Sequence, residues 1–340
     1  MSGKRLPPTL QNRGVTCMES NSCMVSVYCS VYNHKKYIAQ CLDSLVSQKT
    51  SFEYEIIVKD DASTDGTSDI IRAYSQKYPD KIVPLILEEN HLQRGLGHVA
   101  FERAFNLMHG KYIAMCEGDD FWTDKNKLQK QVELMESHPE YSLCGHAAYY
   151  ADEDGELIKG KCFRYKSSSS ELTTEEVLSS WAMATCSLLY RKECRTDVTF
   201  PFQGKCINSD YALMVYMALK GKVYYLDEMM SAYRISCSGS VTQRARKDAE
   251  YHKKRILEYA AMLERIDQYS DYRYTEILTL RRRKTLFDLY LHMCDKASLR
   301  QYPDIYRISP FKTRLKYILC VYCNPVYKPI HIACQKIKNK

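Results

Sequence analysis

The sequence lacks a long apolar run. Residues 1–23 are polar and show no basic start followed by an apolar core of signal-peptide length, so we expect a disordered leader there. Polar and charged residues also interrupt the apolar stretch 317–334, which leaves no segment of about 20 apolar residues for a transmembrane helix. These absences lead us to expect a cytoplasmic protein.

A disulfide framework is also missing. The 15 cysteines are odd in number and scattered through stretches typical of strands and helices, which favours reduced, buried thiols. The only Cys-x-x-Cys pair is Cys320 and Cys323, with Cys334 as its one near neighbour, so a zinc site is a minor alternative.

The sequence does contain enough apolar residues for a large core. Of 340 residues, 45% are hydrophobic and 26% are charged, which predicts a soluble globular protein with one large domain and an appendage. The formal net charge is +8, but residues 241–340 hold 22 Lys and Arg against 10 Asp and Glu, which leaves about −4 for residues 1–240. The basic part suits an anionic membrane, nucleic acid or a solvated helical surface.

Strand-like and helix-like apolar patterns alternate along the first part of the chain. This alternation predicts an α/β fold with a doubly wound, largely parallel sheet and helices on both faces. Pro84 favours an edge position for the third strand. Residues 141–151 and 157–165 then predict a hairpin, and Ser167 to Ser170 a flexible surface loop. The four alternating strands are expected at residues 24–33, 54–61, 81–87 and 112–117.

Acidic residues crowd the end of the fourth expected strand. Glu117, Asp119 and Asp120 follow directly after an apolar run. In open α/β folds the carboxyl ends of strands form ligand sites, and carboxylates at this density raise one another's pKa unless a cation neutralises them. A solvated turn with a helix cap is the simpler alternative. Asp60 and Asp61 repeat the pattern of an apolar strand followed by acids, which favours a cation site.

A further acid, Asp210, opens an expected helix. It lies in the stretch Asn208-Ser209-Asp210-Tyr211, and Gly221 ends the helical spacing that follows. An acid in the first turn stabilises the helix dipole, and this structural role alone would account for Asp210. A catalytic role for Asp210 is indicated only when the other acidic blocks of the sequence are considered with it.

Taken together, these blocks resemble family 2 glycosyltransferases. The resemblance covers residues 24–240 and is greatest for bacterial enzymes that extend O-antigen or capsule saccharides with nucleotide-activated sugars. It implies a GT-A fold with a nucleotide-binding half, residues 24–122, and an acceptor half, residues 123–240, while the basic extension 241–340 is expected to be helical. The blocks, in the order of the family, are Ser30 to Asn33, Asp60 to Thr67, Asn90, Glu117 to Trp122 and Ser209 to Tyr211.

The resemblance also implies a reaction and its partners. It implies an inverting single displacement from a nucleotide-sugar donor, of the UDP or dTDP type, to a saccharide acceptor that we expect on a lipid carrier, with no role for nucleic acid. On the donor side, Asp61 is expected to hydrogen-bond the nucleobase, with Tyr32 and Asn33 lining the same pocket.

The resemblance assigns the remaining acids as well. Glu117 is expected to face the ribose, and Asp119 to hold a divalent cation, Mg²⁺ or Mn²⁺, with Asp120 in the adjoining shell. Such a cation offsets charge on a departing diphosphate. Asp210 is expected to act as the general base that takes the proton of the acceptor hydroxyl.

One block departs from the family. Many members carry Tyr-Arg-x-His after the base helix, whereas this chain has Tyr233-Arg234-Ile235-Ser236. A serine does not replace an imidazole as a metal ligand at equal strength. Arg234 is still expected to face the donor diphosphate.

Two other classes of protein fit parts of the pattern. A phosphoacceptor regulator also binds Mg²⁺ with strand-end acids, but such domains are much shorter and lack a second acidic block after the fourth strand. A non-catalytic protein that docks a basic tail on a polyanion is the second alternative. An assay of sugar transfer or donor hydrolysis in the presence of metal distinguishes an enzyme from both of these alternatives.

The C-terminal stretch 311–340 has an amphipathic start. Apolar residues fall on one helical face and basic residues flank that face, which is typical of a helix that lies on an anionic membrane surface. The alternative is that this face packs on the catalytic domain. The apolar face consists of Phe311, Leu315, Ile318, Leu319 and Tyr322, flanked by Lys312, Arg314 and Lys316.

Overall fold

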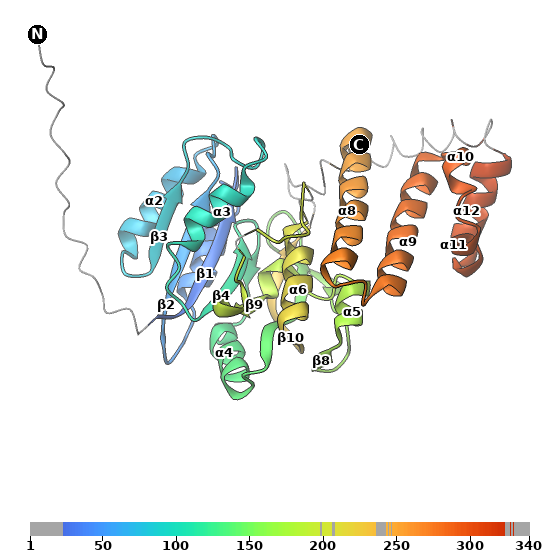
Figure 1. The fold of residues 1–340 in the computed structure, drawn as a ribbon. Coiled ribbons are helices and arrows are strands. Elements are labelled where there is room, and N and C mark those ends of the chain that lie inside the picture. The colour runs from blue at the N-terminus through green and yellow to red at the C-terminus, as the bar shows by residue number, and fades with distance from the viewer. Residues whose placement is uncertain are drawn as a thin grey trace, which may run out of the picture.

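The structure is a computed structural model that describes residues 23–197, 199–205, 208–235, 243, 245, 247–323, 327 and 329. The chain runs from the N-terminal strands and helices, at the left of Figure 1, to a group of C-terminal helices at the right. The expected leader lies outside the described residues, except for Cys23, which already belongs to the first strand.

The N-terminal half is a parallel sheet with the expected alternation of strands and helices. Its strands lie side by side in the order β3-β2-β1-β4, and all three pairings are parallel. Pro84 lies in β3 at the edge of this sheet, as predicted. The elements are β1 (Cys23–Val31), α1 (Ile38–Val46), β2 (Glu53–Asp60), α2 (Thr67–Lys77), β3 (Ile82–Ile86), α3 (Gly97–Phe105) and β4 (Tyr112–Glu117).

The second half extends the same sheet in the order β9-β6-β10-β5. β9 is antiparallel to both β4 and β6, whereas β10 runs parallel to β6. The expected hairpin is present as β6 and β7, but Ser170 is not part of a loop, because it begins β8 and pairs with β10. The elements are β5 (Phe121–Trp122), α4 (Lys127–Ser137), β6 (Tyr141–Ala151), β7 (Leu157–Phe163), β8 (Ser170–Leu172), α5 (Thr174–Ser179), η1 (Thr185–Ser187), β9 (Leu189–Arg191), η2 (Lys192–Cys194), α6 (Ser209–Lys220) and β10 (Lys222–Arg234).

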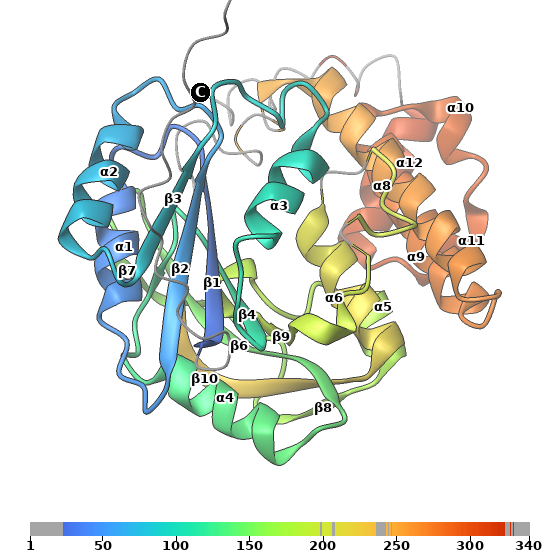
Figure 2. The same cartoon turned by 60° about the vertical axis from the view of Figure 1, so that its left-hand side comes forward.

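Helices cover both faces of the sheet, as Figure 2 shows for α1 and α2 on one side and α3 on the other. Alternate residues of each strand point to opposite faces, so each face has its own core. In β4, Tyr112 and Ala114 pack toward α1 and α4, whereas Ile113 packs toward α5 and α6. The strand ends are therefore fixed by packing on both sides, and the loops that follow them meet at one edge.

The C-terminal helices form an extension whose first helix belongs to the main core. α8 buries Tyr259, Met262 and Ile266 in the same cluster as α6, while α9, α11 and α12 share a smaller core around Phe287 and Tyr317. Among the described residues, no helix combines the length and the apolar character needed to cross a bilayer. The elements are α8 (Ala249–Tyr269), α9 (Thr275–Met293), α10 (Lys296–Leu299), α11 (Pro303–Ile308) and α12 (Phe311–Tyr322).

Candidate active site

The acidic turn after β4 lies beside the end of β1. Parallel pairing sets Glu117 opposite Ser30 and Asp60 opposite Val31, so both acidic blocks reach the same edge of the sheet. Gly118 permits this close approach, because a Cβ at that position would lie 2.8 Å from Val31 Cγ2. The sheet register therefore brings together acids that are far apart in the sequence.

The carboxylates of Glu117, Asp119 and Asp120 converge. One oxygen from each lies within 4.8 Å of the others. Loss of water around Glu117, together with the charges of Asp119 and Asp210, raises the pKa of Glu117 to about 8, although Lys59 acts in the opposite direction. Burial and the charges of Asp119 and Glu117 hold the pKa of Asp120 well above its ordinary value. Without a cation, this cluster resists full ionisation.

The turn has the chemistry of a divalent cation site. The side chain of Asp120 is buried, and its Oδ2 atom has no hydrogen-bond partner among the described residues. A buried carboxylate oxygen without a partner is costly unless a cation or water satisfies it. Hard oxygen ligands also suit Mg²⁺ and Mn²⁺. The residues present therefore fit the divalent cation expected from the sequence, and Asp119 and Asp120 are the residues that would bind it.

Arg234 supports this turn from behind. Its backbone N–H donates to Asp120 Oδ1 at 2.8 Å, and its Nε donates to the carbonyl of Asp119 at 2.7 Å. The guanidinium is buried and also donates to the Asp152 and Glu153 carbonyls and, at 2.7 Å, to Gln40 Oε1. These contacts give Arg234 a bracing role that the sequence did not predict. Contact with a donor diphosphate stays a prediction, and Ser236 lies outside the described residues.

Asp60 and Asp61, the second acidic pair, organise the neighbouring loops. Asp60 is fully buried, and its Oδ1 accepts hydrogen bonds from the backbone N–H and the hydroxyl of Ser63. Asp61 is also buried, and its oxygens accept the backbone N–H groups of His91, at 3.2 Å, and Leu92, at 3.0 Å. Asp60 is therefore a structural residue. Asp61 fixes the loop after β3 and retains further lone pairs for a nucleobase, which stays a prediction.

Asn33 and Tyr32 lie at the end of β1, next to these loops. Asn33 adopts a left-handed backbone conformation with φ 54°, and its side-chain oxygen accepts the Thr64 backbone N–H at 2.8 Å. Asparagine tolerates this conformation better than most residues. The Tyr32 hydroxyl accepts a hydrogen bond from Gln93 at 3.4 Å. Both residues thus border the same loops as Asp61, and their contact with a nucleobase is untested.

Asp210 faces the acidic turn from the opposite half of the molecule. It lies in the first turn of α6, whose N-cap is Asn208, and its Oδ2 accepts a hydrogen bond from Trp181 Nε1 at 2.8 Å. Burial raises the pKa of Asp210, while the Trp181 hydrogen bond and Arg255 oppose that rise. The charge of Asp210 is near enough to act on Glu117. The structure thus places the predicted base within electrostatic reach of the acidic turn.

Tyr233 links the acidic turn and Asp210 electrostatically. Burial raises its pKa, and the charges of Asp120, Glu117, Asp119 and Asp210 raise it further. One tyrosine therefore lies within electrostatic reach of all four carboxylates, which come from two separate stretches of the sequence. The sequence did not predict a role for Tyr233, because its motif pointed only to Arg234 and to the missing histidine.

Sequence reasoning missed two other residues of the site. Trp181, which follows α5, orients Asp210, and nothing in its local sequence indicates this role. His34 has a buried Nδ1 atom without a hydrogen-bond partner among the described residues, and this atom would lie 3.0 Å from a Cβ at Gly118. Its position directly after Tyr32 and Asn33 at a strand end was a usable signal.

The apolar face of α12 is exposed. Phe311 is 72% exposed and Tyr322 is 71% exposed, while Leu315 and Ile318 lie between them on the same side. The alternative that this face packs on the catalytic domain is wrong. The opposite side of α12 is buried against α9. Most of residues 324–340 lie outside the described part of the chain.

The described cysteines do not form the metal site of the minor zinc alternative. Cys320 is buried with its Sγ 2.6 Å from Cys294 Sγ, whereas Cys323 is exposed and Cys334 lies outside the described residues. Within the described part of the chain, the acidic turn is the one group of side chains spaced to hold a metal ion.

Comparison with known proteins identifies the family. Residues 26–196, about half of the chain, match the model of glycosyl transferase family 2. An uncharacterized protein of Mycobacterium bovis is 34% identical over 216 residues, which cover 63% of this chain and 60% of that protein. The Escherichia coli enzyme WfaP, named a UDP-Glc:alpha-D-GlcNAc-diphosphoundecaprenol beta-1,3-glucosyltransferase, is 28% identical over 225 residues, or 66% of this chain and 82% of its own.

Solved structures agree on the fold. S. aureus TarS 1–349 in complex with UDP-GlcNAc has a TM-score of 0.52 at 17% identity, with 92% of each chain covered. A mannosyltransferase of Pyrobaculum calidifontis in complex with GDP-Man and Mn²⁺ also has a TM-score of 0.52, at 15% identity, with 94% of this chain and 88% of that chain covered. With the family match and this architecture, the chain belongs to glycosyltransferase family 2 and has the GT-A fold.

Proposed function

We propose that the protein is an inverting glycosyltransferase that moves a sugar from a nucleotide-sugar to a saccharide acceptor in surface polysaccharide biosynthesis. The observation that carries this proposal is the convergence of the carboxylates in the acidic turn, Glu117 to Asp120, with the charge of Asp210 near enough to act on Glu117. The two sides differ in task, because one is suited to hold a cation and diphosphate and the other to take a proton. The named activities of WfaP, a glucosyltransferase, and of the Pyrobaculum calidifontis mannosyltransferase support the same class of reaction.

On the donor side, the proposal assigns a task to each group. Asp61 and the residues at the end of β1 bind the nucleobase, and Glu117 binds the ribose. Asp119 and Asp120 hold a divalent cation, which when bound offsets the charge that develops on the departing diphosphate. Arg234 keeps the Asp119 carbonyl and the Asp120 carboxylate in place.

On the acceptor side, Asp210 acts as the general base. Its carboxylate takes the proton of the acceptor hydroxyl while that oxygen bonds to the anomeric carbon and the bond from this carbon to the diphosphate breaks. The Trp181 hydrogen bond fixes one carboxylate oxygen, so the other is left for the acceptor. Burial raises the pKa of Asp210, which makes it a stronger base than an ordinary carboxylate.

The exposed face of α12 suits an acceptor on a lipid carrier. Phe311 and Tyr322 are among the most exposed large apolar side chains of the described chain, and Lys312 and Arg314 are exposed beside them. An apolar face flanked by cations fits an anionic membrane surface, since each basic residue near such a surface contributes about 1 kcal/mol. We propose that α12 docks on the membrane that carries the acceptor.

A donor panel tests the proposed function. Uridine, thymidine and guanosine diphosphate sugars are incubated with the protein in Mn²⁺ or in EDTA, and the released nucleoside diphosphate is measured. We expect at least one donor to be turned over, and only in Mn²⁺. If no donor is bound or turned over, or if turnover is equal in EDTA, the proposal is wrong.

A further inference from the structure

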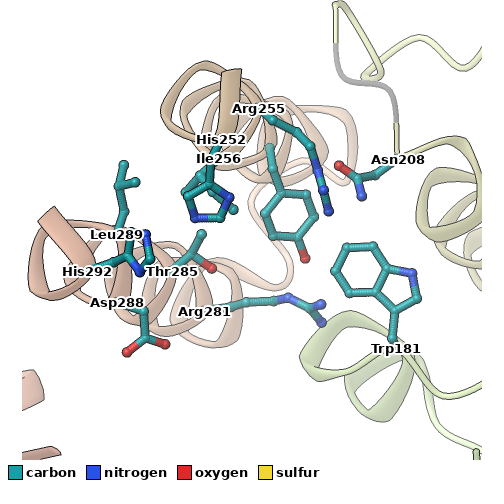
Figure 3. Close-up of a pocket in the computed structure, with 11 residues that line it drawn as sticks. Trp181, Asn208, His252, Arg255, Ile256, Arg281, Thr285, Asp288, Leu289 and His292 are labelled. Atoms are coloured by element: carbon teal, nitrogen blue, oxygen red, sulfur yellow. The ribbon is translucent and has the colours of Figure 1, made fainter. Parts of the chain in front are cut away.

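We propose that the cavity between α8 and α9 is an acceptor subsite that binds a phosphate group. This inference rests on the proposed transfer reaction and adds to it the chemical class of the acceptor. The cavity has a volume of about 370 Å³ and is lined by α8, α9, Trp181 and Asn208 (Figure 3). It lies on the acceptor side of the molecule, away from the donor residues at the ends of β1, β2 and β4.

The cavity shares a wall with the proposed base. Trp181 lines the cavity and donates its indole N–H to Asp210, and Asn208 is the N-cap of the helix that carries Asp210. Arg255, which also lines the cavity, is near enough to lower the pKa of Asp210. A molecule bound here would therefore lie next to the acceptor hydroxyl that Asp210 deprotonates.

Two guanidinium groups enter the cavity from different helices. In Figure 3, Arg255 of α8 and Arg281 of α9 extend toward Trp181 from opposite sides. The Arg255 Nε atom is buried without a hydrogen-bond partner, and neither arginine forms a salt bridge among the described residues. Arg281 donates to the Leu178 carbonyl, and its guanidinium lies over the Trp181 ring. A buried cation without an anionic partner is costly, so this arrangement favours an anionic ligand.

The one acid that lines the cavity does not neutralise these arginines. Asp288 lies at the end of the cavity away from Trp181 and Asn208 (Figure 3). The cations that act on Asp288 are Lys316 and Lys284. Near the base, the two arginines therefore face one carboxylate, that of Asp210, whose charge acts on Arg255.

The arrangement of donors points to phosphate rather than to carboxylate. A carboxylate presents two oxygens in one plane, which a single guanidinium fork matches, whereas a phosphate presents oxygens in several directions. Arg255 and Arg281 approach from two sides, which suits the phosphate. The Trp181 and Tyr259 rings and Thr285 line the remaining space, which is room for the sugar or lipid part next to that phosphate.

Calorimetric titration in EDTA tests the subsite without the donor site, which needs a cation. The probes are inorganic phosphate, pyrophosphate and a short prenyl diphosphate, so that a free phosphate group is distinguished from one on a lipid. The variant is Arg255→Gln, with Arg255→Lys as a second variant that keeps the charge but not the guanidinium fork. The control is Lys254→Gln, which removes the same charge from an exposed neighbour on the same helix.

We expect at least one probe to bind the wild type at least tenfold more tightly than Arg255→Gln, an intermediate loss for Arg255→Lys, and a change of less than twofold for Lys254→Gln. The preferred probe then identifies the source of the phosphate. If no probe binds, or if both glutamine variants bind alike, the inference is wrong even when donors are still turned over in Mn²⁺. If the probes bind as expected but no donor is bound or turned over, the subsite stands as an anion site and the proposed transfer fails.

Discussion

The donor side and the acceptor side of the candidate site are built in different ways. On the donor side, Asn33, Asp61 and Glu117 each lie at or just after the end of a parallel strand, and the register of β1 with β2 and β4 brings them together. On the acceptor side, Trp181 follows one short helix and Asp210 opens another, and packing alone joins them. The geometry of the donor side therefore follows from the sheet register, whereas the geometry of the acceptor side depends on contacts between particular side chains.

The two sides also differ in charge. The acidic turn crowds carboxylates together, which suits a cation. The cavity beside α8 and α9 holds two arginines that form no salt bridge within the described part of the chain, which suits an anion. Asp210 lies between them, within electrostatic reach of both Glu117 and Arg255. This division is expected if a charged donor and a charged acceptor must be held apart on either side of the reacting atoms.

The largest effect is expected from Asp210→Asn, because it removes the base. Turnover should fall by roughly 10² to 10⁴ with donor affinity nearly unchanged. The raised pKa of Asp210 means that its ionised form lowers stability above that pKa, a cost that disappears as the pH falls. At neutral pH the variant should therefore unfold at the same temperature as the wild type or higher. Loss of stability with turnover intact would mean that Asp210 only supports the helix.

Arg234→Gln separates a bracing role from donor contact. The buried guanidinium donates to Asp119 O and Gln40 Oε1, so its loss should cost about 3 kcal/mol of unfolding free energy, measured by urea denaturation. The control, Arg164→Gln, breaks an exposed pair with Asp227 and should change stability little. If Arg234→Gln is as stable as the wild type but binds donor weakly, Arg234 contacts the diphosphate as the sequence suggested.

Trp181→Phe should lower turnover by about tenfold or more, since a hydrogen bond to a charged group contributes about 1.5–3 kcal/mol. The phenyl ring keeps much of the packing against Tyr211 and Tyr259. Because the indole N–H lowers the pKa of Asp210, its loss should move the acid limb of the pH–rate profile to higher pH. An unchanged profile and rate would show that Trp181 does not position the base.

The smallest effect is expected at α12, far from the chemistry. Phe311→Ser with Leu315→Ser should weaken sedimentation with anionic vesicles about tenfold, because each side chain loses apolar contact with the lipid. Leu157→Ser, which removes a leucine of similar exposure from β7, is the control. Truncation before α12 is a poorer test, because its inner face completes the core around Phe287. Equal sedimentation of all three proteins would contradict membrane docking.

The donor side could be predicted from the sequence better than the acceptor side. Strand ends in a parallel sheet meet at one edge, so Asp61, Glu117 and Asp119 could be placed together from periodicity and the family resemblance alone. The task of Arg234 could not be read, because its partners at Gln40 and Asp119 depend on how β10 passes behind the turn. The strand pairing of Ser170 was missed because a serine run gives no apolar alternation.

The acceptor side was harder to predict for a physical reason. Trp181 and Arg255 do not lie at the ends of parallel strands, so the sheet register does not predict their positions. Their proximity to Asp210 follows from the packing of α8 against α6. The exposed face of α12 was visible as a helical pattern, but the sequence could not tell an exposed apolar face from one buried on a neighbour. Side-chain packing between distant helices is not encoded in local periodicity.

The most direct test of the account is the cation dependence of nucleotide binding, measured by thermal unfolding. With Mn²⁺ and the preferred nucleoside diphosphate at 100 times its dissociation constant, the wild type should gain about 2.7 kcal/mol of stability, and this gain should vanish in EDTA. Asp119→Ala should keep its fold but lose the Mn²⁺-dependent gain, whereas Asp69→Asn, an exposed acid on α2, should retain it. If Asp119→Ala binds the nucleotide with unchanged Mn²⁺ dependence, the acidic turn is not the cation site and the central claim is wrong.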